Sequence, residues 1–326
     1  MSVRTISASQ WLIAVIAIAG LIFLVRHFAQ FQEFMALLNK AEPVWLIVAL
    51  GLQAATYASV ASGWNAVLRR ASQPQPLRRL IPIAISKLFA DQAIPGAGLG
   101  GNVLLVERLN NLGTSRGSAM AALLVSTIGY YASYSTLAMI MLLVLRLHRQ
   151  ATPLLTGLVT MLLMVSIAIP SLALWLRNHG NRPLPAGIER IGPLHKLLQL
   201  AGEAPEDLIK DRALIAKVTA FNALVFVADA ATLAVCLLAV GQPLELSSAF
   251  VALMCGSIAM TLSLIPMGLG TFEATCIGIL TLLGIAIEPA IAATLLLRGF
   301  TLWLPLGLGL IFLHSGRKKQ DDSEDD

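Results

Sequence analysis

Long apolar stretches that carry almost no charge dominate this chain, and they limit its fold more than any other feature. Six of them lie at about residues 11–28, 44–68, 118–146, 153–176, 213–240 and 289–314. A helix rises about 1.5 Å per residue, so stretches of roughly 20 residues can cross the hydrocarbon core of a bilayer. In lipid, backbone polar groups must find partners within the segment, which makes such segments helical. The sequence therefore predicts an all-α integral membrane protein with about six crossings.

Two further apolar regions, residues 77–109 and 247–284, are interrupted near their middles. Proline and glycine cause both breaks, at Ile94-Pro95-Gly96-Ala97-Gly98-Leu99-Gly100-Gly101 and at Ile265-Pro266-Met267-Gly268-Leu269-Gly270. Each region is expected to form two half-helices that meet inside the membrane. Such a pair is a re-entrant hairpin, which enters and leaves on one side and is tolerated where protein or a water-filled cavity surrounds it.

The distribution of basic residues tests this topology. With a cytoplasmic N-terminus and two hairpins, only Arg26, Lys40, Arg146 and Arg149 lie outside. Lys87, Lys217 and Arg298 fall within spans, and every other Lys and Arg is cytoplasmic. This asymmetry follows the positive-inside rule. We therefore expect a multi-pass membrane protein with both termini in the cytoplasm.

The two hairpins would open on opposite sides, as in an inverted repeat. Ile94-Pro95 matches Ile265-Pro266, and Leu112-Gly113 matches Leu283-Gly284, at one constant offset in residue number. Interrupted segments at corresponding places indicate a transporter site near the bilayer midplane. Chance matching in an Ala- and Leu-rich chain is the alternative. The expected domain is 1–319, with repeats at about 44–146 and 213–314, followed by an acidic disordered tail at 320–326.

Charge, cysteine and histidine usage exclude several other classes of function. The formal net charge is +5, but the basic residues are scattered beside apolar spans, so we predict no nucleic-acid partner. The three cysteines lie in apolar segments and the five histidines are far apart. This spacing predicts no metal site and no cofactor.

One string of residues points to a family. Ile265 to Ala274, followed by Leu283-Gly284, Ala292-Ala293 and Leu297-Arg298-x-x-x-Leu302-Trp303-Leu304-Pro305, resembles the C-terminal signature of the lysylphosphatidylglycerol synthase transmembrane, or flippase-like, family. The break near residue 95 lies where that family has its first motif, and the resemblance covers nearly the whole chain. It implies lipid translocation rather than lipid synthesis, because the soluble aminoacyl-transferase domain of bifunctional members is lacking. Asn102 is a departure, since family members often carry an acidic residue there.

Ionisable side chains within spans are costly and therefore suggest function. Lys87 and Asp91 are four residues apart on one helix face, which allows either a structural ion pair or a phosphate-binding lysine positioned by Asp91. Arg298 is the strongest candidate, because a guanidinium group binds phosphate bidentately. Glu273 either caps its half-helix or pairs with Arg298, in which case a headgroup competes for the arginine.

The glycines of the two breaks have two possible roles. Gly98, Gly100, Gly101, Gly268 and Gly270 allow tight turns and close packing, and they also leave half-helix N-termini that attract an anionic headgroup. Asn102 either caps the second half-helix of the first hairpin or contacts substrate.

Two features elsewhere in the spans stay open. Asp229 stands alone among apolar neighbours, and is protonated, paired with another span, or coupled to proton transport. Tyr130, Tyr131 and Tyr134 form a stripe that either packs between helices or lines a cavity.

The expected function is a flippase-like transporter, not an enzyme, that moves an anionic phospholipid or lipid-linked precursor between the leaflets of a bacterial cytoplasmic (inner) membrane. One alternative is an accessory or scaffold subunit of a cell-envelope lipid pathway, and another is an intramembrane lipid-modifying enzyme. The best acidic cluster for an enzyme is Glu203, Glu206, Asp207 and Asp211, which is typical of a solvated loop. The expected partner is the lipid substrate, with a second copy of the chain or an envelope enzyme as further alternatives.

Overall fold

The computed structural model describes residues 41–93, 99–147, 153–179, 204–243, 245–263 and 266–308, and this part contains helices and no strand. The all-α prediction is confirmed. The predicted first span at 11–28, Gly98 and the tail at 320–326 lie outside the described residues. Long helices are α2 (Pro43–Arg70), α5 (Arg116–Leu147), α6 (Pro153–His179) and α10 (Arg212–Ala239). Shorter elements are α3 (Leu77–Ala93), α4 (Leu99–Asn111), α9 (Glu206–Lys210), α11 (Leu246–Leu262), η1 (Pro266–Gly268), α12 (Thr271–Leu282), α13 (Ile287–Arg298) and η2 (Gly299–Trp303).

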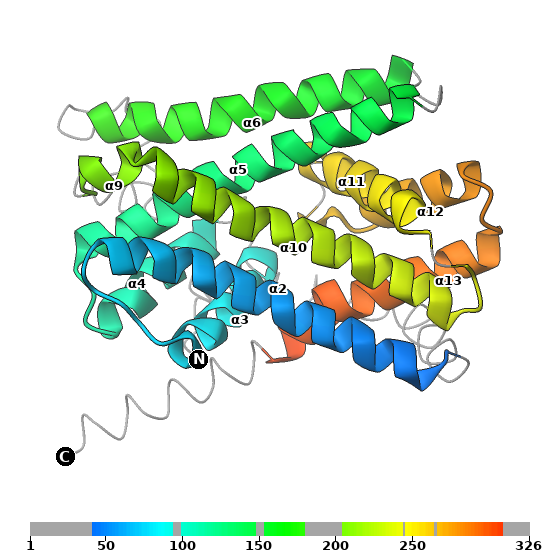
Figure 1. Ribbon diagram of the computed structural model, residues 1–326, viewed down its shortest axis with the longest axis horizontal. Coiled ribbons are helices and arrows are strands. Elements are labelled where there is room, and N and C mark those ends of the chain that lie inside the picture. The colour runs from blue at the N-terminus through cyan, green and yellow to red at the C-terminus, as the bar shows by residue number, and fades with distance from the viewer. Residues whose placement is uncertain are drawn as a thin grey trace, which may run out of the picture.

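The long helices run along the longest axis of the molecule, with α2 packed against α10 and with α5 between α10 and α6 (Figure 1). Four helices in the described part are long and apolar enough to cross a membrane, namely Pro43–Arg70, Arg116–Leu143, Arg212–Ala239 and Ile287–Leu308. In α6 the apolar stretch is shorter, Val159–Ala168. The chain is therefore a multi-pass membrane protein.

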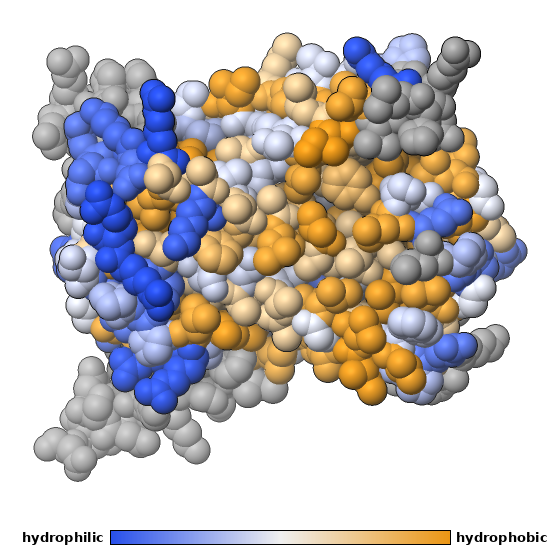
Figure 2. Space-filling model, in the orientation of Figure 1, coloured by the Kyte–Doolittle hydropathy of each residue, from blue (hydrophilic) through white to orange (hydrophobic). Residues whose placement is uncertain are grey.

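The surface agrees with this assignment. In Figure 2 an apolar band crosses the middle of the molecule, and hydrophilic residues gather at both ends of the long axis. Large apolar side chains are exposed on the long helices, among them Ile47 on α2 and Ile167 on α6. Apolar patches of this extent are unusual in soluble monomers, and a surrounding hydrocarbon phase accounts for them.

Polar contacts define the two ends of the bundle. At one end the Arg70 Nε donates to Asp211 Oδ2 over 3.0 Å, and the Asp211 Oδ1 accepts from the Leu214 N–H at the start of α10. The Leu214 N–H, and after it Arg70, lower the pKa of the Asp211 carboxyl, which therefore stays ionised as a helix cap. At the other end the Glu42 N–H donates to the Ala239 carbonyl over 3.2 Å. Helices α2 and α10 are thus antiparallel.

Each broken apolar region forms two helices that pack against each other. The Gln75 side chain donates to the Leu112 carbonyl, which ties the outer ends of α3 and α4 to the Arg70 end of the bundle. Helices α11 and α12 lie at the Ala239 end (Figure 1). The order of long helix, two short helices and membrane-length helix occurs twice, first from α2 to α5 and again from α10 to the span Ile287–Leu308, which begins with α13.

The turn between α11 and α12 has a backbone that glycine favours. Gly268 has a φ of 60° and Gly270 a φ of 82°, in the left-handed region where a Cβ is unfavourable. Met267 shares this conformation at φ 61° without being glycine. Gly270 is the N-cap of α12, so the predicted break at Ile265–Gly270 is the place where the second helix of this pair begins.

Candidate functional site

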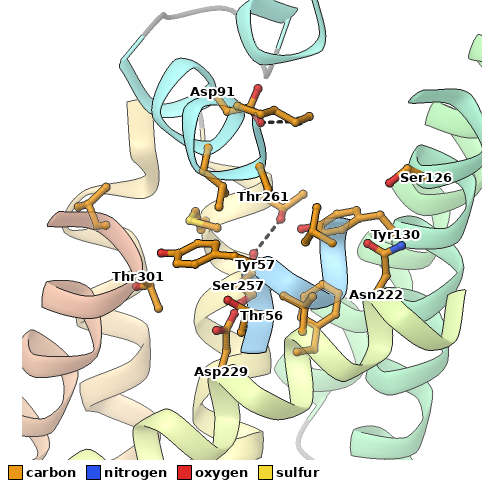
Figure 3. A pocket seen from close by; sticks show the side chains of 18 of the residues that line it. Thr56, Tyr57, Asp91, Ser126, Tyr130, Asn222, Asp229, Ser257, Thr261 and Thr301 are labelled. Carbon is orange, nitrogen blue, oxygen red and sulfur yellow. Dashed lines mark hydrogen bonds and ion pairs between the residues drawn. The ribbon is translucent and has the colours of Figure 1, made fainter. Parts of the chain in front are cut away.

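A cavity of about 610 Å³ lies between the two broken helix pairs, and residues from α2, α3, α4, α5, α10, α11, α12 and α13 line it (Figure 3). Its volume lies in the range of small-molecule and cofactor pockets. The wall combines apolar groups with charged and polar side chains, which include Gln53, Thr56, Tyr57, Lys87, Asp91, Asn102, Ser126, Tyr130, Asn222, Asp229, Ser257, Thr261, Arg298 and Thr301. Of the substrate-binding residues predicted from the sequence, Lys87, Asp91, Asn102, Gly268 and Arg298 line it.

Arg298 links the last helix to the turn between α11 and α12. Its Nε donates to Glu273 Oε1 over 2.6 Å, and its Nη2 donates to the Met267 carbonyl over 3.0 Å. The guanidinium carbon lies 5.0 Å from the centroid of the Phe272 ring, a distance that permits a cation–π contact. Only 8% of the Arg298 side chain is exposed. The position of this cation is therefore fixed by one carboxylate, one carbonyl and one ring.

Glu273 does both things that its sequence position allows. Its Oε2 accepts from the Gly270 N–H over 2.7 Å, which caps α12, while its Oε1 accepts from Arg298. The cap and the ion pair are compatible because a carboxylate has two oxygens. A π-helical segment, Gly299–Trp303, follows Arg298 directly, and such segments often occur at functional sites.

Lys87 and Asp91 form the second charged pair of the cavity. The Lys87 Nζ lies 2.6 Å from Asp91 Oδ2, and both side chains are about one-fifth exposed. The pair is thus the contact that the spacing of four residues predicts. Two cations, each held by a carboxylate on the protein, now lie in one cavity although they are far apart in the sequence.

In the first break, Gly101 allows close packing of two helices. A Cβ on Gly101 would clash with the Asp91 carboxylate and would lie 2.7 Å from the Lys87 carbonyl oxygen. Gly101 therefore lets α4 approach α3 at the ion pair. Gly100 and Asn102 are in the first turn of α4, and only Asn102 lines the cavity. At the second break, Gly268 lines the cavity and Gly270 does not.

Several cavity residues escaped sequence reasoning. The Gln53 side chain of α2 donates to Asp229 Oδ1 of α10 over 2.9 Å, so Asp229 does pair with another span. Tyr57 and Trp64 line the cavity, and the Tyr57 hydroxyl and the Trp64 indole nitrogen are buried and have no hydrogen-bond partner among the described residues. Gln53 and Asp229 are 176 residues apart, which left no local pattern to reveal the contact.

The tyrosine stripe fulfils both of its predicted roles. Tyr130 and Tyr131 line the cavity, whereas Tyr134 is fully buried and stacks on Phe226 with a centroid distance of 5.0 Å. The aromatic rings therefore join α5 to α10 and also form part of the cavity wall.

A comparison with models of protein families identifies the family of this chain. The model of the lysylphosphatidylglycerol synthase TM region matches residues 11–309. The chain belongs to this family. No curated protein matches it. Membership of the lysylphosphatidylglycerol synthase TM family confirms the resemblance predicted from residues 265–305, and it ties this membrane protein to lipid metabolism.

Proposed function

We propose that this protein moves an anionic phospholipid or a lipid-linked precursor between the leaflets of a bacterial inner membrane, and that the cavity holds the headgroup. The observation that carries the proposal is the buried guanidinium group of Arg298 in the cavity wall, which uses Nε and Nη2 in contacts with the protein. A guanidinium group has further N–H donors, and charge-assisted bonds to phosphate are among the strongest hydrogen bonds in proteins. Lys87 supplies a second cation in the same cavity.

The pairing of both cations fits a carrier better than an enzyme. Glu273 and Asp91 keep the charges of Arg298 and Lys87 compensated when no anion is bound, which limits the cost of burying them. A phosphate can compete with these carboxylates and later be displaced by them. Reversible competition of this kind suits binding and release, which is what a transporter needs.

The arrangement of the broken helices supports the same proposal. We treat α3–α4 and α11–α12 as re-entrant hairpins that enter from opposite sides, and α2–α5 and α10–α13 as an inverted repeat. The outer ends of the two pairs lie at opposite ends of the bundle, and the cavity lies between them (Figures 1 and 3). Transporters with inverted repeats hold their substrates at such a place, near the midplane.

The test is leaflet exchange by the purified protein in liposomes. Fluorescent lipids with anionic or zwitterionic headgroups are compared with protein-free vesicles by adding an impermeant quencher. We expect faster exchange of the anionic lipids, and at least a tenfold loss in Arg298→Ala, since a hydrogen bond to a charged group contributes about 1.5–3 kcal/mol. Arg116→Ala, which removes an exposed arginine at the start of α5, is the matched control. Equal exchange with Arg298→Ala, or chemical conversion of the lipid, would contradict the proposal.

A further inference from the structure

Asp229 differs from the other carboxylates of the cavity because no cation accompanies it. In the part of the chain that the structure describes, Asp91 and Glu273 each form an ion pair, and Asp229 forms none. Its Oδ1 accepts a hydrogen bond from the neutral side chain of Gln53. Figure 3 shows the Asp229 side chain extending from α10 into the pocket.

The Gln53 amide is held in place and cannot neutralise the carboxylate. Its Nε2 also donates to the Thr232 Oγ1 over 3.2 Å, and the Thr232 hydroxyl in turn donates to the Ala228 carbonyl over 2.8 Å. Gln53 and Thr232 are almost fully buried. The bond to Thr232 holds the amide nitrogen in place, and the bond to Asp229 orients the carboxylate without cancelling its charge. The Oδ2 atom of Asp229 has no hydrogen bond within the described residues and can accept a proton.

The groups that share the cavity with Asp229 define its charge environment. From the elements around it these titratable groups are Tyr57 of α2, Lys87 and Asp91 of α3, Tyr130 and Tyr131 of α5, and Arg298 of α13 with its partner Glu273 of α12. Two cations and two paired carboxylates balance one another. An ionised Asp229 adds one uncompensated negative charge, which is costly within a membrane and repels an anion.

We propose that Asp229 binds a proton and couples the movement of the anionic lipid to the movement of that proton in the same direction. The inference rests on the lipid-transport function proposed above. A proton from water on one side bonds to Asp229 Oδ2 and is later released to water on the other side, and no other bond changes. Because the neutral carboxyl no longer repels the headgroup, proton and anion favour each other's binding, and this linkage is reciprocal.

A pH gradient across the proteoliposome membrane tests the coupling. With the fluorescent anionic lipid initially in both leaflets, wild-type protein should accumulate it in the leaflet that faces the alkaline compartment, and reversing the gradient should reverse the asymmetry. For one proton per lipid, a gradient of one pH unit supports a leaflet ratio of at most about tenfold. Asp229→Asn keeps an acceptor for Gln53 but cannot take up the proton, so we expect equal leaflets. Glu288→Gln, an exposed acid in the first turn of α13, should keep the wild-type asymmetry.

The outcomes separate the coupling from transport itself. If the wild-type protein exchanges lipid but a pH gradient does not shift the leaflet distribution, the coupling is overturned and the transport function stands. A leaflet asymmetry that persists in monodisperse Asp229→Asn protein would overturn the assignment to Asp229. In an infrared titration we expect a protonated-carboxyl C=O band that disappears in Asp229→Asn, and the absence of such a band would also overturn the assignment. A wild-type protein that exchanges no lipid would overturn both proposals.

Discussion

Two ion pairs, Lys87–Asp91 and Arg298–Glu273, hold the two cations of the cavity wall. The Lys87–Asp91 pair was predictable because four residues separate its members on one helix. The Arg298–Glu273 pair was one of two alternatives, because a separation of 25 residues in the sequence does not by itself bring two side chains into contact. The contact of Gln53 with Asp229 had no sequence signal, because neither a motif nor opposite charges mark it.

The Arg298–Glu273 pair yields a prediction at this scale. Arg298→Ala leaves the Glu273 carboxylate, whose side chain is only 18% exposed, without its cation, so loss of the ion pair alone can lower protein abundance. The double substitution Glu273→Ala, Arg298→Ala removes both charges and should restore abundance, yet lipid exchange should remain at least tenfold below wild type, because the phosphate ligand is missing. Exchange per molecule of purified protein is the measurement. Recovery of wild-type exchange would mean that Arg298 only neutralises Glu273.

Close packing at Gly101 gives a second prediction. Gly101→Ala forces a Cβ against Asp91 and the Lys87 carbonyl, so we expect a loss of about 1–3 kcal/mol in stability. Gly51→Ala is the matched control: this helical glycine has open space around its Cβ, and alanine should stabilise α2 by about 0.5–1 kcal/mol. Thermal unfolding of the purified proteins in detergent compares them. A Gly101→Ala protein as stable as wild type would contradict the packing argument.

At the scale of elements, proline and glycine located the second break correctly, whereas Ile94–Gly98 of the first lie outside the described residues and Leu99–Gly101 already belong to α4. The second break was predicted at Ile265–Gly270, and α12 begins at Thr271 because Gly268 and Gly270 supply left-handed backbone there. The π-helical segment after Arg298 was not predictable, since no residue pattern in Gly299–Trp303 distinguishes it from an α-helix. The partners of each short helix also depend on tertiary packing, which the pattern of apolar residues does not specify.

The turn between α11 and α12 leads to a third prediction. Gly268→Leu places a side chain at a φ of 60° and against Met260 in the cavity wall, so exchange should be abolished. Gly157→Leu in α6 meets open space and should leave exchange close to wild type. Abundance and monodispersity are measured beside exchange. A well-folded Gly268→Leu protein with normal exchange would show that this turn does not border the lipid path.

At the scale of the whole molecule, hydropathy established the class of protein but not the number of crossings. Four described helices meet the length and hydropathy of a span, whereas six crossings were predicted, one of them outside the described residues. The cavity itself was not predictable, because it forms only when eight helices from both halves of the chain assemble. Orientation in the membrane stays a prediction that rests on the positive-inside rule.

Cysteine labelling tests that orientation. In intact cells, a cysteine at Gln75 or Gly180 should be protected from an impermeant thiol reagent added outside, and a cysteine at Gln242 should react. Gln75 and Gln242 lie near the Arg70 and Ala239 ends of the bundle, respectively. The native cysteines Cys236, Cys255 and Cys276 are buried and provide a low background. Labelling of Gly180→Cys from outside would contradict the topology with two hairpins.

The most direct test of the central claim is to block the cavity and measure lipid exchange. Ser126→Cys places a thiol in the cavity wall on α5, and Thr136→Cys places one on an exposed position of the same helix, outside the cavity. Each protein is reconstituted, treated with a bulky membrane-permeant maleimide, and assayed for exchange of a fluorescent anionic lipid, with labelling quantified by mass spectrometry. We predict that full alkylation of Ser126→Cys stops exchange, while full alkylation of Thr136→Cys leaves it near the untreated rate. Undiminished exchange by fully alkylated Ser126→Cys would show that the lipid does not pass through this cavity.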